Sequence, residues 1–354
     1  MRLQHSSKSG GLNDFVAMTR HFQRIFVTGG AGYCGSRLVP QLLAHGYKVT
    51  VYDIMYFGSH CLPKRHSNLQ VIEGDIRDTA KLAAAAAGHD AFVSLACISN
   101  DASFELDEKL STSINYDAFE PMVLAAKNAG VKRFVYASSS SVYGVSDQAD
   151  VTEEHPLVPL TLYNRYKGIC EPLLRKHTDE RFVGVTFRPA TVCGYAPRQR
   201  LDLSVNILTN HAVNNNKITV FGGSQLRPNL HIQDYVDAVE LFLTAPDDKI
   251  RDEVFNVGYQ NLSIMDIAHL VREVVREEFP RGEHIDIITT PTDDIRSYHI
   301  NSDKIRSVLG FRPRHTIADA VRELCSAFHE GKLPNSMHDD LYFNVRRLKR
   351  LKAA

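Results

Sequence analysis

The chain has 354 residues, 44% of them apolar and 23% charged, and its 41 basic and 41 acidic side chains give a formal net charge of zero. This length accommodates one large α/β domain and a smaller one, and the balanced charge argues against nucleic acid or an acidic membrane as the main partner. No apolar run is long enough for a membrane span, and the six cysteines and sixteen histidines show no disulfide or metal-ligand spacing, so we expect a cytoplasmic protein with free thiols and no metal.

The first half of the chain alternates short apolar runs with helical stretches. Residues 1–23 lack the apolar core of a signal sequence and are expected to form a flexible lead. Runs rich in Val, Ile and Phe predict strands at 24–29, 48–53, 69–75, 91–96, 133–138 and 184–189, and helices are predicted at 36–46, 83–87 and 113–129. This alternation predicts a Rossmann-type α/β domain over 24–189, with a doubly wound parallel sheet covered on both faces.

The regular alternation loosens after residue 190. Turn-rich pieces such as YAPRQR and FGGSQLRP, followed by helices at 263–278 and 316–329, predict a smaller substrate lobe that occupies most of 190–330. A helix at about 231–245 is expected to return to the first domain. The basic tail within 331–354 is interpreted as a solvated terminal face, with an interaction tail as the alternative.

A glycine-rich loop joins the first predicted strand to the first helix. Gly29, Gly32 and Gly35 give the spacing G-x-x-G-x-x-G, which permits a tight turn, close approach of the backbone to a pyrophosphate, and a helix N-terminus directed at that anion. Asp53 follows at the end of the second strand, where a carboxylate accepts hydrogen bonds from ribose hydroxyls and repels a 2′-phosphate. The pattern therefore favours NAD over NADP, although Asp53 could instead only cap a loop.

Tyr163 and Lys167 form a second candidate site in LYNRYKGICE. Residues four apart share one face of a helix, whereas Tyr166 points away from its neighbour Lys167, so Tyr163 is the predicted acid/base. A phenol is a poor base at neutral pH because its pKa is near 10. A neighbouring ammonium is expected to stabilise the phenolate and lower that pKa.

Several motifs occur in a fixed order along residues 24–330: TGGAGYCG, Asp53, GDIRD, LAC at 95–97, INYDAF, SSSSVYG, YNRYK and RPATVCG. Together they resemble the extended short-chain dehydrogenases/reductases, specifically the NAD-dependent nucleotide-sugar epimerases and dehydratases. The resemblance implies bound, recycled NAD and hydride transfer at C4 of a nucleotide-diphosphate sugar. It also implies a homodimer formed by packing the 113–129 and 163–177 helices.

The resemblance assigns roles to individual residues. Tyr163 would take the 4-hydroxyl proton, Lys167 would hold the nicotinamide ribose, and Ser139 would hydrogen-bond the reacting oxygen. For Asn115, one of the implied cofactor contacts, the alternative is a purely structural role, and for Asp75 it is that of a plain loop residue. The implied cofactor contacts are Gly29, Gly32, Tyr33, Cys34, Gly35, Asp53, Asp75, Ile76, Leu95, Ala96, Asn115, Lys167 and Pro189.

The remaining implied contacts are with the nucleotide sugar. Arg227 and Arg296 offer planar, charge-assisted hydrogen bonds to a diphosphate, with surface ion pairs as the alternative. Asn206 is a candidate for the nucleotide side or, alternatively, a helix-surface residue. Ser139 and Ser140 complete the predicted substrate contacts.

The four serines in SSSSVYG bear on the reaction. Family dehydratases carry an Asp-Glu pair where this chain has Ser140 and Ser141, and a serine is neither a useful acid nor a useful base without activation. The sequence therefore favours a 4-epimerase over a 4,6-dehydratase. A 4-reductase or 4-dehydrogenase needs the same residues and stays open.

Overall fold

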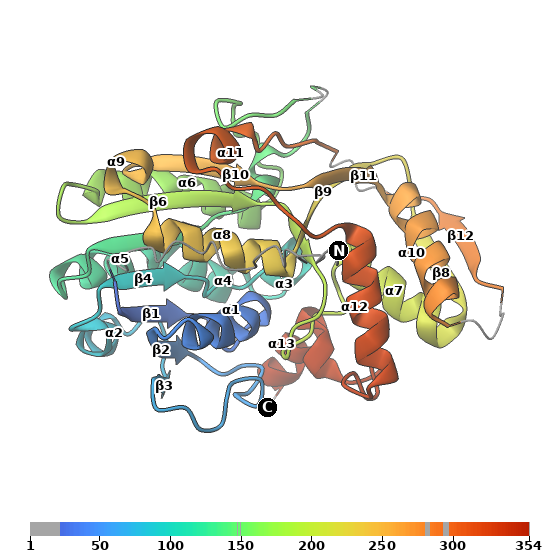
Figure 1. Ribbon diagram of the computed structural model, residues 1–354, viewed down its shortest axis with the longest axis horizontal. Helices are drawn as coiled ribbons and strands as arrows, with labels where there is room; N and C mark the ends of the chain where they lie inside the picture. The colour runs from blue at the N-terminus through green and yellow to red at the C-terminus, as the bar shows by residue number, and fades with distance from the viewer. Residues whose placement is uncertain (1–21, 147, 149, 280–283, 293–296, 354) are drawn as a thin grey trace, which may run out of the picture.

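A central parallel sheet organises the molecule (Figure 1). The computed structural model describes residues 22–146, 148, 150–279, 284–292 and 297–353. Nearly all of the predicted flexible lead, 1–21, lies outside them. Within the described residues the sheet has seven strands in the order β10-β6-β5-β4-β1-β2-β3. The order reverses at β1, as in a doubly wound fold, and confirms the predicted Rossmann-type architecture.

The strands match the predicted apolar runs with one addition. The six predicted strands correspond to β1 to β6, whereas β10 was not expected. The burial of each strand follows its position in the sheet. Every residue of the inner strands β5 and β6 is buried, whereas the edge strand β3 is largely accessible. The bounds are β1 Arg24–Thr28, β2 Lys48–Asp53, β3 Leu69–Glu73, β4 Ala91–Ser94, β5 Arg133–Ala137, β6 Val183–Pro189 and β10 Glu253–Val257.

Helices cover both faces of this sheet. One face packs against α1 (Tyr33–Ala44) and α8 (Ile232–Thr244), which confirms the predicted return helix. The other packs against α2 (Thr79–Ala86), α5 (Phe119–Asn128) and α6 (Leu162–His177). The predicted helical segment over 113–129 is confirmed, although its first turn, Ser113–Asp117, is π-helical and precedes α5. Short helical segments complete this part: α3 Asp101–Phe104, α4 Glu108–Thr112, a 3₁₀ turn Ser140–Tyr143, and α9 Asp247–Ile250.

A smaller lobe is built beside the carboxyl ends of the strands (Figure 1). Its apolar core lies between α7, α10 and α12, beside the parallel pair of β8 and β12, while β11, β9 and β7 form a further sheet. β10 lies within the predicted lobe of 190–330 but returns to the main sheet, so the chain crosses between the two parts more than once. The predicted domain limits therefore stay a prediction. The bounds are β7 Thr191–Cys193, α7 Ser204–Asn215, β8 Lys217–Phe221, β9 Leu226–His231, β11 Gln260–Ser263, α10 Ile264–Glu278, β12 Asp286–Thr290, α11 Asp303–Leu309 and α12 Ile317–His329.

The C-terminal segment forms a helix whose basic face is mostly solvated. After a 3₁₀ turn at Asp340–Tyr342, helix α13 (Asn344–Ala353) packs back onto the main domain. Arg347 Nε donates to the carbonyl of Tyr56 at 2.6 Å, and Lys352 Nζ donates to the carbonyl of Leu106 at 3.2 Å. The other basic side chains of the helix are exposed, as the predicted solvated face requires, although two of the five also bond to the first domain.

Two predicted absences can be compared with the described residues. None of the helices in that part of the chain is long and apolar enough to cross a membrane. Over the same residues no group of three or more His, Cys, Asp or Glu side chains is placed to hold a metal ion.

Candidate active site

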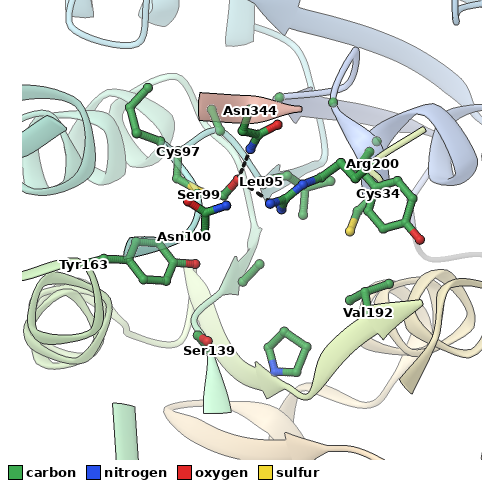
Figure 2. A pocket seen from close by; sticks show the side chains of 18 of the residues that line it. Cys34, Leu95, Cys97, Ser99, Asn100, Ser139, Tyr163, Val192, Arg200 and Asn344 are labelled. Atoms are coloured by element: carbon green, nitrogen blue, oxygen red, sulfur yellow. Dashed lines mark hydrogen bonds between the residues drawn. The ribbon is translucent and has the colours of Figure 1, made fainter. Parts of the chain in front are cut away.

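A cavity of about 430 Å³ lies where the carboxyl ends of the strands meet the smaller lobe. Its walls come from the loops that follow β1, β2, β4 and β5, from α6, from the segment after β6, and from α13. Open α/β sheets bind ligands at this edge, next to the point where the strand order reverses. Figure 2 shows the side chains that converge there.

The glycine loop forms one wall and needs glycine for steric reasons. Gly29 has φ +74°, and a Cβ there would lie 2.6 Å from the backbone nitrogen of Ala96. A Cβ on Gly35 would lie 2.4 Å from the carbonyl oxygen of Gly29. The loop therefore packs tightly against the backbone after β4 and against itself, and the first residues of α1 line the cavity. No side chain of the described residues caps this helix at Gly32, which leaves the N-terminus available to an anion.

Asp53 holds the loop from the end of β2. Its Oδ2 accepts a hydrogen bond from the backbone N–H of Ala31 at 3.0 Å, and its Oδ1 accepts one from Met55 at 2.8 Å. Burial raises the pKa of this carboxyl, although the two N–H groups favour the ionised form. Asp53 thus caps the loop and also lines the cavity. Together with the glycine cradle, it fits the diphosphate and ribose of a dinucleotide.

Tyr163 and Ser139 point into the same cavity. Figure 2 shows the hydroxyl of Tyr163 directed at the centre of the cavity, with Ser139 below it. Lys167 Nζ donates to the carbonyl of Ala137 at 2.7 Å and lies 5.3 Å from the centre of the Tyr136 ring, and Lys167 lines the cavity too. Tyr166 stacks on Tyr116 instead, with ring centroids 5.1 Å apart.

The acidity of Tyr163 differs from the expectation drawn from its spacing to Lys167. Burial raises the pKa of Tyr163 well above its usual value, the charge of Asp101 raises it further, and the charge of Arg200 opposes both. The ammonium of Lys167 is not among the main influences. Desolvation of a phenolate inside the protein thus outweighs the charge of Arg200.

The serine run divides into two hydrogen-bond networks. Ser139 Oγ lies 2.7 Å from Ser141 Oγ, and Ser141 Oγ donates to Oδ1 of Asn164 at 2.5 Å. Ser138 Oγ donates to Oε1 of Glu171 at 2.6 Å, below the cavity wall. The hydroxyl at 139 is therefore oriented from the α6 side by a neutral chain of hydrogen bonds.

Most of the predicted ligand contacts lie on the cavity wall. The predicted residues that line the cavity are Gly29, Gly32, Tyr33, Cys34, Gly35, Asp53, Asp75, Ile76, Leu95, Ala96, Ser139, Ser140, Tyr163, Lys167, Pro189 and Arg227. The carboxylate of Asp75 is also hydrogen-bonded to Arg77, which lowers the pKa of Asp75 against the effect of burial. Arg296 falls outside the described residues.

Two predicted contacts are placed elsewhere. Asn115 is buried, and its amide accepts from the N–H of Ile98 at 2.8 Å and donates to its carbonyl at 2.9 Å, so its side chain orders the loop after β4. Asn206 is fully buried; its amide accepts from Gly194 N–H and donates to the Tyr33 hydroxyl and to the Arg200 carbonyl. Both amides bond to protein partners, and neither residue is among those that line the cavity, so their ligand contacts stay a prediction.

Other residues of the wall were missed. Arg198 and Arg200 come from the turn YAPRQR, Asp101 begins α3, and Asn344 begins α13. The two arginines carried a signal in the sequence, because paired cations two residues apart in a turn are typical of anion sites. Asp101 and Asn344 carried none.

Comparison with known proteins gives consistent matches. The family model described as "NAD dependent epimerase/dehydratase family" matches residues 25–258. A dTDP-glucose 4,6-dehydratase of Streptomyces niveus is 27% identical over 329 residues, which cover 87% of this chain and 94% of the relative. A UDP-glucose 4-epimerase of Lactobacillus helveticus is 27% identical over 338 residues, covering 87% and 97%. The structure of MoeE5 with UDP-glucose and NAD is similar with a TM-score of 0.74 at 25% identity, covering 87% of this chain and 99% of MoeE5.

Proposed function

The chain belongs to the NAD dependent epimerase/dehydratase family, and we propose that within it the protein is a nucleotide-sugar 4-epimerase. The observation that carries the proposal is the set of side chains around Tyr163. A phenol and a serine hydroxyl face the cavity together, while Ser140 and Ser141 stand where a dehydratase needs an acid and a base. The relatives named for both reactions are equally similar to this chain, so the argument rests on these residues.

We assign a separate role to each of Tyr163, Ser139 and Lys167. Proton exchange with the 4-hydroxyl is assigned to Tyr163; because burial raises the pKa of this phenol, the role requires positive charge beside the phenolate, which Lys167 and the bound nicotinamide would supply. Ser139 lies beside Tyr163 at the reacting oxygen, and it would donate to that oxygen when its hydroxyl proton turns away from Ser141 Oγ. Bound NAD would supply the hydride acceptor and donor for C4, held by the glycine loop, Asp53 and Lys167. Lys167 keeps two N–H donors beyond the one used by Ala137, and these can hold the nicotinamide ribose.

Asp101 is the carboxylate that complicates the choice of reaction. It acts on the pKa of Tyr163, so it is near the phenol, but its Oδ1 accepts a hydrogen bond from Thr161 Oγ1 at 2.5 Å. That bond fixes the carboxylate to the start of α6 and favours an orienting role over proton transfer at C5. Elimination is therefore an outcome that the experiment must be able to detect.

The test is a panel of UDP-glucose, UDP-N-acetylglucosamine and GDP-hexoses, incubated with the protein as purified and without added reductant. We expect inversion at C4 of at least one sugar, with no net change in absorbance at 340 nm. Stoichiometric NADH consumption or release would indicate a reductase or dehydrogenase, and loss of water would indicate a dehydratase. Failure of every sugar to invert over long incubation would refute the proposal.

The assembly and the location of the protein stay predictions. We expect a homodimer built from α5 and α6, whose exposed Leu124 is suited to an apolar helix contact. Sedimentation at micromolar concentration tests this, and a monomer would contradict it. A cytoplasmic location can be tested by cell fractionation.

A further inference from the structure

Two arginines of the smaller lobe enter the cavity with unsatisfied donors. Arg198 and Arg200, in the loop between β7 and α7, are 4% and 8% exposed. Arg198 Nε and Arg200 Nη2 are buried and have no hydrogen-bond partner within the described chain. A buried donor of a cation that lacks a hydrogen-bond partner is costly, so these two donors indicate an anionic ligand.

Two carboxylates act on the two arginines, but among the described residues neither bonds to the buried donors Arg198 Nε and Arg200 Nη2. Arg200 Nε donates to Asp202 at 2.8 Å, whereas Arg198 lies flat on the ring of Phe57, 3.6 Å from its centre. Burial and the charge of Arg200 together lower the pKa of Arg198 to about 9, so it is still a cation at neutral pH. Asp53 attracts Arg198 more weakly than Asp202 does.

The position of the arginines assigns the anion to the cofactor side. The backbone N–H of Arg198 donates to Oγ of Ser36, in the first turn of α1. The charges of Arg200 and Arg198 also act on Cys34, the second residue of α1, lowering a thiol pKa that burial raises to about 12. Both arginines line the cavity together with the glycine loop, and Figure 2 shows Arg200 beside Cys34 of the first turn of α1.

Helix α13 fixes this loop from the far end of the chain. Asn344 Oδ1 accepts from Arg198 Nη2 at 2.5 Å, Asn344 Nδ2 donates to Ser99 Oγ at 2.9 Å, and the backbone N–H of Asn344 donates to Asp202. Ser99 in turn accepts from Arg200 at 3.3 Å. Asn344 thus holds the Arg198 side chain directly and the Arg200 side chain through Ser99 and Asp202. The dashed lines in Figure 2 mark the two hydrogen bonds of Ser99, with Asn344 and with Arg200.

We propose that Arg198 and Arg200, locked by Asn344, form a clamp on the diphosphate of the bound dinucleotide opposite the glycine loop, so that NAD dissociates only when α13 releases the loop. The two guanidinium groups supply planar, charge-assisted donors that match two phosphate groups. This inference rests on the family's cofactor and is independent of which reaction the protein performs.

The test measures retention of NAD in the full-length holoenzyme, without any sugar. Bound NAD is quantified after acid release, and its exchange is followed against excess labelled NAD. Arg200→Met and Arg198→Met should each accelerate exchange about 10- to 100-fold, as expected for loss of charge-assisted hydrogen bonds. Arg200→Lys should recover part of the loss. Arg350→Gln is the matched control, because it removes a cation from the exposed side of α13 and should leave exchange unchanged.

Asn344→Ala tests the lock separately from the charge. It should accelerate exchange with both arginines present, and combining it with Arg200→Met should add little. NAD should also slow hydrogen exchange or proteolysis of α13 in the wild-type protein. Wild-type exchange rates in Asn344→Ala and in correctly folded Arg200→Met would overturn the clamp. Unchanged NAD retention combined with a raised KM for nucleotide sugars would assign the arginines to the substrate diphosphate instead.

Discussion

Replacing Glu171 by glutamine tests how the catalytic helix is anchored. Glu171 lies one turn beyond Lys167 on α6, and its carboxylate accepts from Arg188 at 2.6 and 3.0 Å and from Ser138 at 2.6 Å. The side chains of Glu171 and Arg188 are only 7% and 6% exposed. Burial alone would lower the pKa of Arg188, but the bonds and charge of Glu171 raise it instead.

The expected loss follows from leaving a buried guanidinium without its counter-charge. Breaking one side of a buried ion pair costs about 3–5 kcal/mol. Unfolding entropy of about 2.1 cal/mol/K per residue gives roughly 0.7 kcal/mol/K for the whole chain, so Tm should fall by about 4–7 °C. Differential scanning calorimetry at pH 7 measures this shift.

The control is an ion pair of the same chemistry at the surface. Arg175 and Asp252 are 60% and 45% exposed, and such pairs contribute about 0–1 kcal/mol. Asp252→Asn should therefore shift Tm by less than about 2 °C. A Tm for Glu171→Gln within that same small range would show that Arg188 is not held by this carboxylate as we describe.

Further predictions concern the loop, the phenol and alkaline pH. Gly35→Ala places a Cβ against a loop carbonyl and should cost about 1–3 kcal/mol while reducing bound NAD, measured by calorimetry and acid release. Tyr163→Phe should lower kcat about 10²- to 10⁴-fold with unchanged NAD content, and full activity would exclude it as the acid/base. Burial raises the pKa of Tyr33, Tyr136, Tyr163 and Tyr235, so the folded chain binds protons more tightly than the unfolded one above pH 10. Stability should be intact below about pH 10 and fall by about 1.4 kcal/mol per pH unit for each such tyrosine above it, with phenolate absorbance at 295 nm appearing together with unfolding.

The main sheet was predictable because its strands are local apolar runs. β5 and β6 are buried throughout, and this burial is encoded residue by residue in their sequences. β10 is also a short run with a buried end, but it follows an irregular stretch of sequence. Its return to the main sheet depends on α8, which leads the chain back to that domain and which precedes β10.

The site was predictable where a short motif encodes the geometry. The glycine spacing and the Tyr163–Lys167 spacing each describe one turn of backbone or helix. For Asn115 and Asn206 the sequence could not separate a ligand contact from a structural role, because an amide fits a ligand and a backbone equally well; the fold gives both amides protein partners. Asn344 contacts Ser99 across 245 residues, and no local pattern encodes such a contact.

The measurement that bears most directly on the proposed chemistry follows a deuterium at C4. The purified protein is incubated in ordinary water with its accepted nucleotide sugar carrying deuterium at C4, and the product is analysed by NMR. We expect the inverted sugar to retain the deuterium at C4, because the hydride stays on the bound coenzyme between removal and return. Deuterium found at C6 with loss of water, or C4 deuterium replaced by solvent hydrogen, would contradict the account.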